Sequence, residues 1–219
     1  MPCRIEDYAV IGNCETVALV GRDGSIDWLG LPRFDSAACF AALLGEPRHG
    51  RWRIAPAGRA RATRSYRGDT LILDTVFQTE TGAVRLTDFM VRGDRWAGVT
   101  RIATGLEGEV AMRMELIVRF DYGSVIPWVS RQEDGRLQFI AGPDRLLLET
   151  TASVRGEDRS SVAEFTAGAG ETTHFRLSWS RPGRSRRGPR RSPRRCSRSR
   201  RNGPAGREPS TRASREAGP

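Results

Sequence analysis

The chain has 219 residues, with 36 basic and 26 acidic side chains and a formal net charge of +10. Residues 181–219 hold fourteen Arg and two Glu, a charge of +12, and subtracting +12 from +10 leaves −2 for residues 1–180. The apolar-rich part of the chain is therefore not basic, which excludes a nucleic-acid or anionic-membrane surface on a structured face as the source of the charge.

The last 39 residues, 181–219, contain no Val, Ile, Leu, Met, Phe, Trp or Tyr. Without large apolar side chains, nothing offsets the entropy lost on ordering the backbone, so we expect a disordered Arg/Pro/Ser/Gly-rich tail. Out-of-frame translation of GC-rich DNA would give this composition, and a frameshift is our preferred origin over an evolved basic arm. Any polyanion affinity of the tail would be non-specific and lost with added salt.

Residues 1–180 are enough for one domain with a real core. In chain order, the first predicted element is a hairpin that pairs residues 16–20 with 25–31 around the turn Gly21-Arg22-Asp23-Gly24. The segment Ser36–Leu44 is the one predicted helix, because Ser36 is a suitable N-cap and Gly45 follows as a stop.

A second hairpin is predicted over residues 70–91, around the turn Thr79-Glu80-Thr81-Gly82. Residues 110–120 give the clearest alternation of apolar and polar side chains, with a period of two that is typical of a half-buried strand. A third hairpin is predicted to pair 128–131 with 137–140 around Glu133-Asp134-Gly135, and further strands are predicted at 145–152, 161–166 and 172–179.

About ten closely spaced strands, Gly-containing turns and one short helix predict an all-β fold, an antiparallel β-sandwich resembling a supersandwich. Parallel βαβ units are excluded because no crossover helices are predicted. We therefore expect two parts: a β-sandwich domain at 1–180 and a disordered tail at 181–219.

The sequence contains few motifs that indicate a catalytic or metal-binding site. There is no phosphate loop, no G-x-S-x-G elbow and no metal-ligand cluster, so no metal or cofactor is predicted. The four Cys show no paired spacing and only His49 and His174 are available as further ligands, which indicates incidental thiols in a reducing cytoplasm. No secretory signal and no membrane span is predicted, and we expect a cytoplasmic protein.

Several runs resemble a known family. They are Ile5–Val20, Gly24–Leu29, Pro32–Ser36 and Phe40–Gly45, continued by Asp69-Thr70-Leu71, Thr87-Asp88-Phe89-Met90, Arg119-Phe120-Asp121-Tyr122-Gly123, Pro127-Trp128-Val129, Gly142-Pro143-Asp144 and Phe175–Trp179. In order and over about 175 of the 219 residues, they resemble the N-terminal, trehalase-like domain of bacterial glycoside hydrolase family 15 proteins of the trehalase and glucoamylase type.

This resemblance implies a two-part enzyme, in which an N-terminal β-sandwich precedes a six-hairpin α/α barrel. Such enzymes hydrolyse terminal α-glucosidic bonds, in trehalose or maltodextrins, with inversion, which requires one carboxylic acid and one carboxylate held apart on a rigid frame. Both catalytic glutamates of the family lie in the barrel, whose Thr-Thr-Ser-Leu-Pro-Glu and Arg-Asn-Trp-Asp-Tyr-Arg motifs are absent from this chain.

The expectation is therefore an accessory domain truncated or frameshifted before the barrel, with no catalytic residue of its own and no activity alone. Its partners would be the missing barrel and, in the parent, an α-glucoside. Trehalose and maltodextrin stay open, as does the oligomeric state. Among the carboxylates, Asp23 and Asp134 are explained by turns, while Asp74 and Asp88 are expected to face each other or an Arg across a hairpin.

The candidate site is the segment Trp28–Ser36, which would face the barrel. Trp28 and Phe34 would stack on a sugar face, and Arg33 and Asp35 would bond hydroxyls. The alternative, which we prefer, is structural: Trp28 and Phe34 in the core, Arg33 paired with Asp35 or another acid, and Asp35 and Ser36 capping the helix.

Three other classes stay open. A stand-alone carbohydrate-binding module would need an exposed aromatic platform, for which Trp52, Trp96 and Trp128 are available. A nucleic-acid- or membrane-binding protein would depend on the Arg tail. A purely structural fragment would expose an apolar face where the barrel normally sits.

Overall fold

The structure is a computed structural model that describes residues 4–91 and 97–181. Its strands are β1 (Tyr8–Gly12), β2 (Val17–Gly21), β3 (Ser25–Gly30), β4 (Ala38–Phe40), β5 (Arg51–Pro56), β6 (Arg61–Tyr66), β7 (Leu73–Gln78), β8 (Gly82–Phe89), β9 (Gly98–Ile117), β10 (Trp128–Arg131), β11 (Leu137–Ala141), β12 (Asp144–Thr150), β13 (Arg155–Glu157), β14 (Ser160–Gly168) and β15 (Thr172–Ser180). The helical segments within these ranges are short 3₁₀ helices: η1 (Ile5–Asp7), η2 (Ala42–Leu44), η3 (Pro47–His49) and η4 (Asp121–Gly123).

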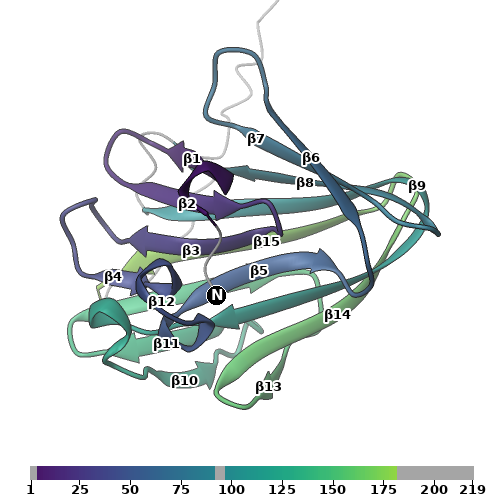
Figure 1. The fold of residues 1–219 in the computed structure, drawn as a ribbon. Helices are drawn as coiled ribbons and strands as arrows, with labels where there is room; N and C mark the ends of the chain where they lie inside the picture. The colour runs from purple at the N-terminus through teal and green to yellow at the C-terminus, as the bar shows by residue number, and fades with distance from the viewer. Residues whose placement is uncertain (1–3, 92–96, 182–219) are drawn as a thin grey trace, which may run out of the picture. The chain divides into compact units, whose positions relative to one another are not determined.

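The strands form two antiparallel layers that share β9. The first layer runs β1-β2-β3-β5-β9-β14-β13, with β4 beside β3, and the second runs β6-β7-β8-β9-β15-β12-β11-β10. In Figure 1 the first layer lies in front of the second, and β9 passes between them at the right-hand end. The predicted antiparallel β-sandwich is confirmed.

The long strand β9 joins the layers because its buried face changes phase in the middle. Its first half pairs with β8 and β15, and its second half pairs with β5 and β14. Side chains at odd positions are buried up to 105, whereas those at even positions are buried from 110 onwards. The exposed segment 106–109 between them includes Gly108 at φ 59°, a left-handed conformation that glycine adopts without a Cβ penalty. Both halves therefore direct their apolar side chains into one core.

Most predicted strands are present. The hairpins β2–β3, β7–β8 and β10–β11 form as predicted. The alternating apolar residues of 110–120 are all buried. Leu71 is an exception, since it precedes β7 and is 47% exposed. The structure also contains strands that the pattern did not predict: β1, β4, β5, β6 and β13.

The predicted helix over Ser36–Leu44 is wrong in its first part. Residues 38–40 form β4, whose three side chains are buried and which pairs with β3 through Leu29–Phe40 and Gly30–Ala38. Only Ala42–Leu44 is helical, as the 3₁₀ helix η2. A short apolar run is compatible with either a buried strand or a helix. Here residues 38–40 form a strand because they pair with the end of β3.

A buried ion pair lies in the core where the layers meet. Arg101 of β9 and Asp88 of β8 face each other across the two strands, with both side chains fully buried. Arg101 donates to the two carboxylate oxygens at 2.8 and 3.0 Å and to the carbonyl oxygens of Trp52 and Gly24 at 2.5 and 2.8 Å. Its guanidinium also lies 5.2 Å from the centre of the Trp52 ring. The expectation that Asp88 faces an Arg is met.

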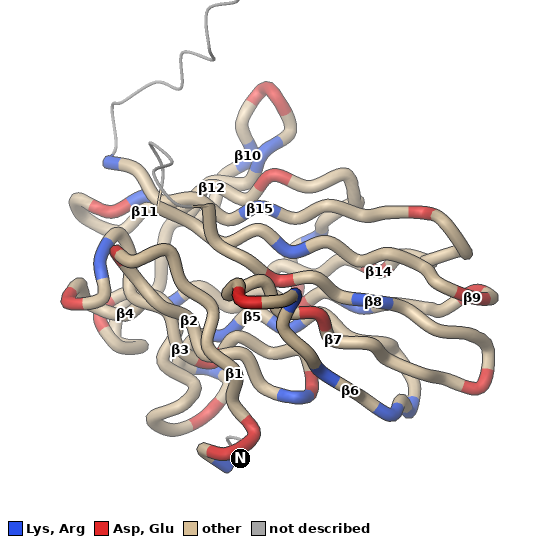
Figure 2. The backbone as a smooth tube through the Cα atoms, turned by 90° about the horizontal axis from the view of Figure 1, so that it is seen from above, with Lys and Arg blue, Asp and Glu red and all other residues tan. Residues whose placement is uncertain are grey.

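Charge on the described domain is mixed. Figure 2 shows acidic and basic residues interspersed along the backbone, without a face of one sign. The predicted disordered tail lies, apart from Arg181, outside the described residues.

Candidate functional site

The segment predicted as a site, Trp28–Ser36, comprises the end of β3 and the loop that follows it, whose backbone is held by hydrogen bonds. Phe34 donates its N–H to the carbonyl of Glu15 at 2.9 Å, and Ser36 donates to the carbonyl of Arg33 at 3.1 Å. The Ser36 hydroxyl in turn accepts the N–H of Arg33 at 3.2 Å. These bonds tie the loop to the turn after β1, so its side chains project from a defined backbone.

Those side chains point outward more than the structural interpretation predicted. Phe34 is 68% exposed, which contradicts the expectation that it belongs to the core. Trp28, on β3, is half-buried. Arg33 and Asp35 form the expected pair, with two hydrogen bonds of 3.0 and 3.2 Å, but both side chains stay largely exposed. The helix that Asp35 and Ser36 were expected to cap is absent, because β4 begins at Ala38.

Sequence reasoning missed Tyr122 as a member of this surface. Its ring lies 6.1 Å from that of Trp28 and is tilted by 39°, and the residue is 50% exposed. Tyr122 belongs to η4, where Asp121 and Tyr122 both have positive φ, of 49° and 56°. The run Arg119–Gly123 was noted only as part of the family resemblance. Trp28, Arg33, Phe34, Asp35 and Tyr122 are called the loop surface below.

Three of the described carboxylates, those of Asp27, Asp74 and Asp88, are bonded to other side chains of the domain. Asp27 accepts hydrogen bonds from the hydroxyls of Tyr8, at 2.7 Å, and Ser25. Asp74 is held by Arg67 at 2.6 Å and by the Thr87 hydroxyl at 2.6 Å. With Asp88 bonded to Arg101, these three acids stabilise the fold, whereas an inverting hydrolase needs two carboxyl groups on opposite sides of a sugar.

Thiol and metal chemistry have little support in residues 4–91 and 97–181. Burial raises the pKa of the Cys39 thiol far above its usual value, so this group stays protonated and is a poor nucleophile. Its Sγ lies 3.4 Å from the carbonyl oxygen of Leu29. Within these residues no group of three or more His, Cys, Asp and Glu is placed to hold a metal ion.

The aromatic residues proposed for a carbohydrate-binding platform are not together. Trp52 is fully buried against Arg101, while Trp128 on β10 is 77% exposed. Trp96 lies outside the described residues. In the same part of the chain, no helix has the length and apolar character needed to cross a membrane.

Comparison with known proteins gives a consistent family. The model of the trehalase-like N-terminal domain matches residues 1–169. A trehalase of Mycolicibacterium smegmatis is 29% identical, over 81% of this chain and 30% of its own length. A trehalase of Mycobacterium tuberculosis is 37% identical over 44% of this chain and 14% of its own, and trehalase 1 of Sulfolobus acidocaldarius is 33% identical over 66% and 24%. The chain thus spans less than a third of these relatives.

Proposed function

Because the chain belongs to the family of trehalase-like N-terminal domains, we propose that residues 1–180 are the accessory domain of an α-glucoside hydrolase of glycoside hydrolase family 15. This proposal rests on the match of residues 1–169 to the trehalase-like N-terminal domain. The chain aligns with only part of each trehalase relative, for example 30% of the length of the Mycolicibacterium smegmatis protein. Trehalose and maltodextrins are the candidate substrates of the parent. Residues 181–219 are the tail, with a frameshift as its origin.

In this proposal the catalytic acid and base lie in a barrel outside the chain. The partners of Asp27, Asp74 and Asp88 support this, because these carboxylates are bonded to Arg, Tyr, Ser or Thr side chains. A general acid needs a raised pKa in a site open to substrate. The chain alone is therefore expected to be inactive.

The loop surface supports a contact with the barrel or with the sugar that it binds. Phe34 is an exposed aromatic residue on a loop held by a backbone hydrogen bond to Glu15. Tyr122 is also exposed and lies in a turn where its own φ is positive. Exposed aromatic rings on a fixed backbone bind apolar sugar faces or a partner surface at low entropic cost. Arg33 and Asp35 add hydrogen-bonding groups at the same place.

The cytoplasm is the compartment that fits. Cys14 and Cys39 are both free thiols, which is usual in a reducing environment.

The first experiment measures glucose release from trehalose and from maltose by purified residues 1–219. We expect no release above the buffer control, whereas turnover at enzyme-like rates would overturn the proposal. Sequencing of the genomic DNA beyond codon 180 is the companion test. A second reading frame that encodes a helical barrel with two glutamate motifs is expected, and stop codons in both alternative frames would contradict the frameshift.

The second experiment concerns the loop surface, in a protein whose barrel has been restored by correcting the frame. Phe34→Ala and Asp35→Ala should raise KM for the sugar substrate while the melting temperature stays close to that of the parent. Leu106→Ala, at an exposed site in β9, is the matched control and should change neither. An unchanged KM in both loop variants would leave the loop surface with a structural role only.

A further inference from the structure

A pocket lies between strands of the two layers, and none of the residues that line it belongs to the loop surface. β10 and β11 of the second layer form one wall, and β13, β14 and the end of β9 form the other. Its volume is about 380 Å³, within the range of about 300–1,000 Å³ typical of small-molecule sites. Leu116, Val118, Leu137 and Phe139 give it an apolar interior. We call it the edge pocket.

Arg119, two residues after the end of β9, lines the edge pocket and is only 8% exposed. Its Nη1 donates to the carbonyl oxygens of Val118 at 2.7 Å and of Arg159 at 3.4 Å. Among the described residues no carboxylate is bonded to this guanidinium. Burial and the nearby charge of Arg159 lower the pKa of Arg119, which is the physical sign of an uncompensated cation.

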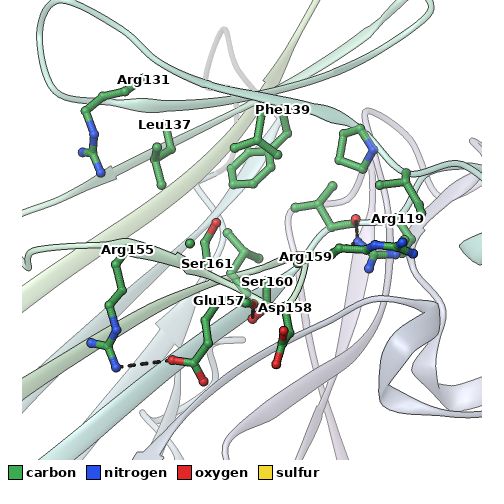
Figure 3. A pocket seen from close by; sticks show the side chains of 16 residues that line it. Arg119, Arg131, Leu137, Phe139, Arg155, Glu157, Asp158, Arg159, Ser160 and Ser161 are labelled. Carbon is green, nitrogen blue, oxygen red and sulfur yellow. Dashed lines mark hydrogen bonds and ion pairs between the residues drawn. The ribbon is translucent and has the colours of Figure 1, made fainter.

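Arg159 brings a second guanidinium to the same end of the pocket. Figure 3 shows Arg119 and Arg159 together at one end, with Leu137 and Phe139 along one wall and Glu157 and Asp158 along the facing wall. The Arg159 side chain likewise has no carboxylate partner in the described part of the chain. The pocket thus has a cationic end and an apolar body.

The turn that carries Arg159 has an unfavourable backbone. Asp158 and Arg159 are the two residues between β13 and β14, and their φ angles are +46° and +61°. Two-residue hairpin loops of this type favour Asn-Gly, and a left-handed non-glycine residue costs about 1–2 kcal/mol. Strain of this kind persists where the surrounding structure holds it, and it is common at binding sites.

The acidic residues of the pocket do not neutralise this end. Glu157 is engaged by Arg113 at 2.8 Å and by Arg155 at 3.3 Å. Asp158 is exposed, with no ion pair or hydrogen bond from its side chain in the described structure, and it opposes an anion only weakly through water. The balance favours a ligand with a single negative charge over a polyanion.

We propose that the edge pocket binds a small organic monocarboxylate with an aromatic or aliphatic body. The carboxylate lies against Arg119 and Arg159, and the body lies against Phe139 and Leu137. A planar guanidinium matches a carboxylate in geometry, and a charge-assisted bond from the buried Arg119 is little screened by water, whereas Arg159 is exposed and adds a second, more strongly screened charge. This site does not depend on the proposed hydrolase, because none of its residues belongs to the loop surface.

The test is a calorimetric titration of purified residues 1–219 with 3-phenylpropionate. Its neutral amide keeps the body without the charge, and acetate keeps the charge without the body. We expect saturable binding of the acid, about tenfold tighter than that of either probe, since each loses one of the two contributions. Chemical-shift changes on binding should fall on Phe139 and Leu137.

Variants of the turn separate binding from folding. Arg159→Gly removes the charge but relieves the left-handed backbone, so the protein should stay folded while binding weakens about tenfold. Arg159→Lys keeps the charge but loses the planar fork, so its binding should be weaker than that of the parent and tighter than that of Arg159→Gly. Asp158→Asn removes the opposing charge and should tighten binding.

Three results would overturn the proposal. One is equal affinity for acid and amide, which would indicate a merely apolar pocket. Another is unchanged affinity in Arg159→Gly. The third is the lack of saturable binding of 3-phenylpropionate at millimolar concentrations.

Discussion

Two buried arginines, Arg101 and Arg119, lie 18 residues apart in the chain, and only the first is paired with a carboxylate among the described residues. Arg101, in the first half of β9, is fully buried and donates to both oxygens of Asp88. Arg119, just beyond the end of β9, is nearly as buried but donates only to carbonyl oxygens. A carbonyl satisfies a hydrogen bond without supplying a negative charge. The first arginine is therefore a completed part of the core, and the second is a cation that still lacks a counter-ion.

The position of each arginine in the sandwich explains this difference. Arg101 lies where β8, β9 and β5 meet, so a cross-strand acid and two carbonyls reach it. Arg119 lines the edge pocket, which the terminal strands β10 and β13 of the two layers flank. Burial alone therefore does not identify an arginine with a structural role, and the charge of its hydrogen-bond partners must be considered as well.

The largest effect is expected when the completed pair is broken. Asp88→Ala should lower the free energy of unfolding by about 3–5 kcal/mol, because it leaves the Arg101 charge buried without a counter-ion. Urea denaturation followed by fluorescence measures it. Asp35→Ala, which breaks the exposed pair with Arg33, is the control and should cost less than about 1 kcal/mol. Equal losses in the two variants would contradict the distinction.

The corresponding change at the second arginine should be much smaller. Without ligand, Arg119→Met should change the free energy of unfolding by about 1 kcal/mol or less, because the lost carbonyl bonds are offset by removal of a desolvated charge. The same denaturation experiment measures it. A loss as large as that of Asp88→Ala would show that Arg119 is also structural.

A third arginine, Arg67, is half-exposed and pairs with Asp74, and this pair should make the stability of the fold depend on pH. Burial raises the pKa of Asp74, but hydrogen bonds from Arg67 and Thr87 outweigh this and hold the pKa below its usual value. A depressed carboxyl pKa stabilises the fold above the unfolded value near ~3.9, and this contribution is lost as pH falls through the folded pKa.

Asp74→Asn should therefore flatten the decline of stability below pH ~4, by an amount on the order of 1 kcal/mol or less. Melting temperatures from neutral to acidic pH measure the slope. Asp35→Asn, at a more exposed pair, is the control, and an equal flattening there would remove the special role of Asp74.

The smallest expected effect concerns the turn beside Arg119. Arg159→Gly should raise the free energy of unfolding by about 0.5–1 kcal/mol, since glycine accepts the left-handed backbone. Glu133→Gly, in a turn where residue 133 does not have a positive φ, should lower it instead. A loss of stability in Arg159→Gly would mean that the side chain contributes more to the turn than its backbone costs.

The sequence predicted the strands well because alternation is a local signal. Apolar and polar residues alternate along 110–120 and along the hairpin 70–91. This alternation is typical of a strand with one buried face. The segment 36–44 was mispredicted because its short apolar run is satisfied equally by a helix or by β4, and the partner β3 is not visible in the local pattern.

Four of the five residues of the loop surface were candidates from the sequence, and Tyr122 was not. The pairing of Arg33 with Asp35 follows from their spacing on one loop, and the structure bears it out. Phe34 was expected in the core from its hydrophobicity, yet it is exposed because the loop backbone bonds to Glu15 and turns the ring outward. Tyr122 was missed because its contact with Trp28 joins residues 94 positions apart.

The amino-acid sequence by itself determined the all-β class, the main hairpins and the family, since these depend on patterns within a few residues or on ordered motifs. Tertiary structure alone decided that β9 changes its buried face at 106–109, that Arg101 is the arginine that pairs with Asp88 and that Arg119 has no acid bonded to it among the described residues. These features depend on which side chains meet across two layers, and long-range contacts of that kind are set by the assembled fold rather than by local alternation.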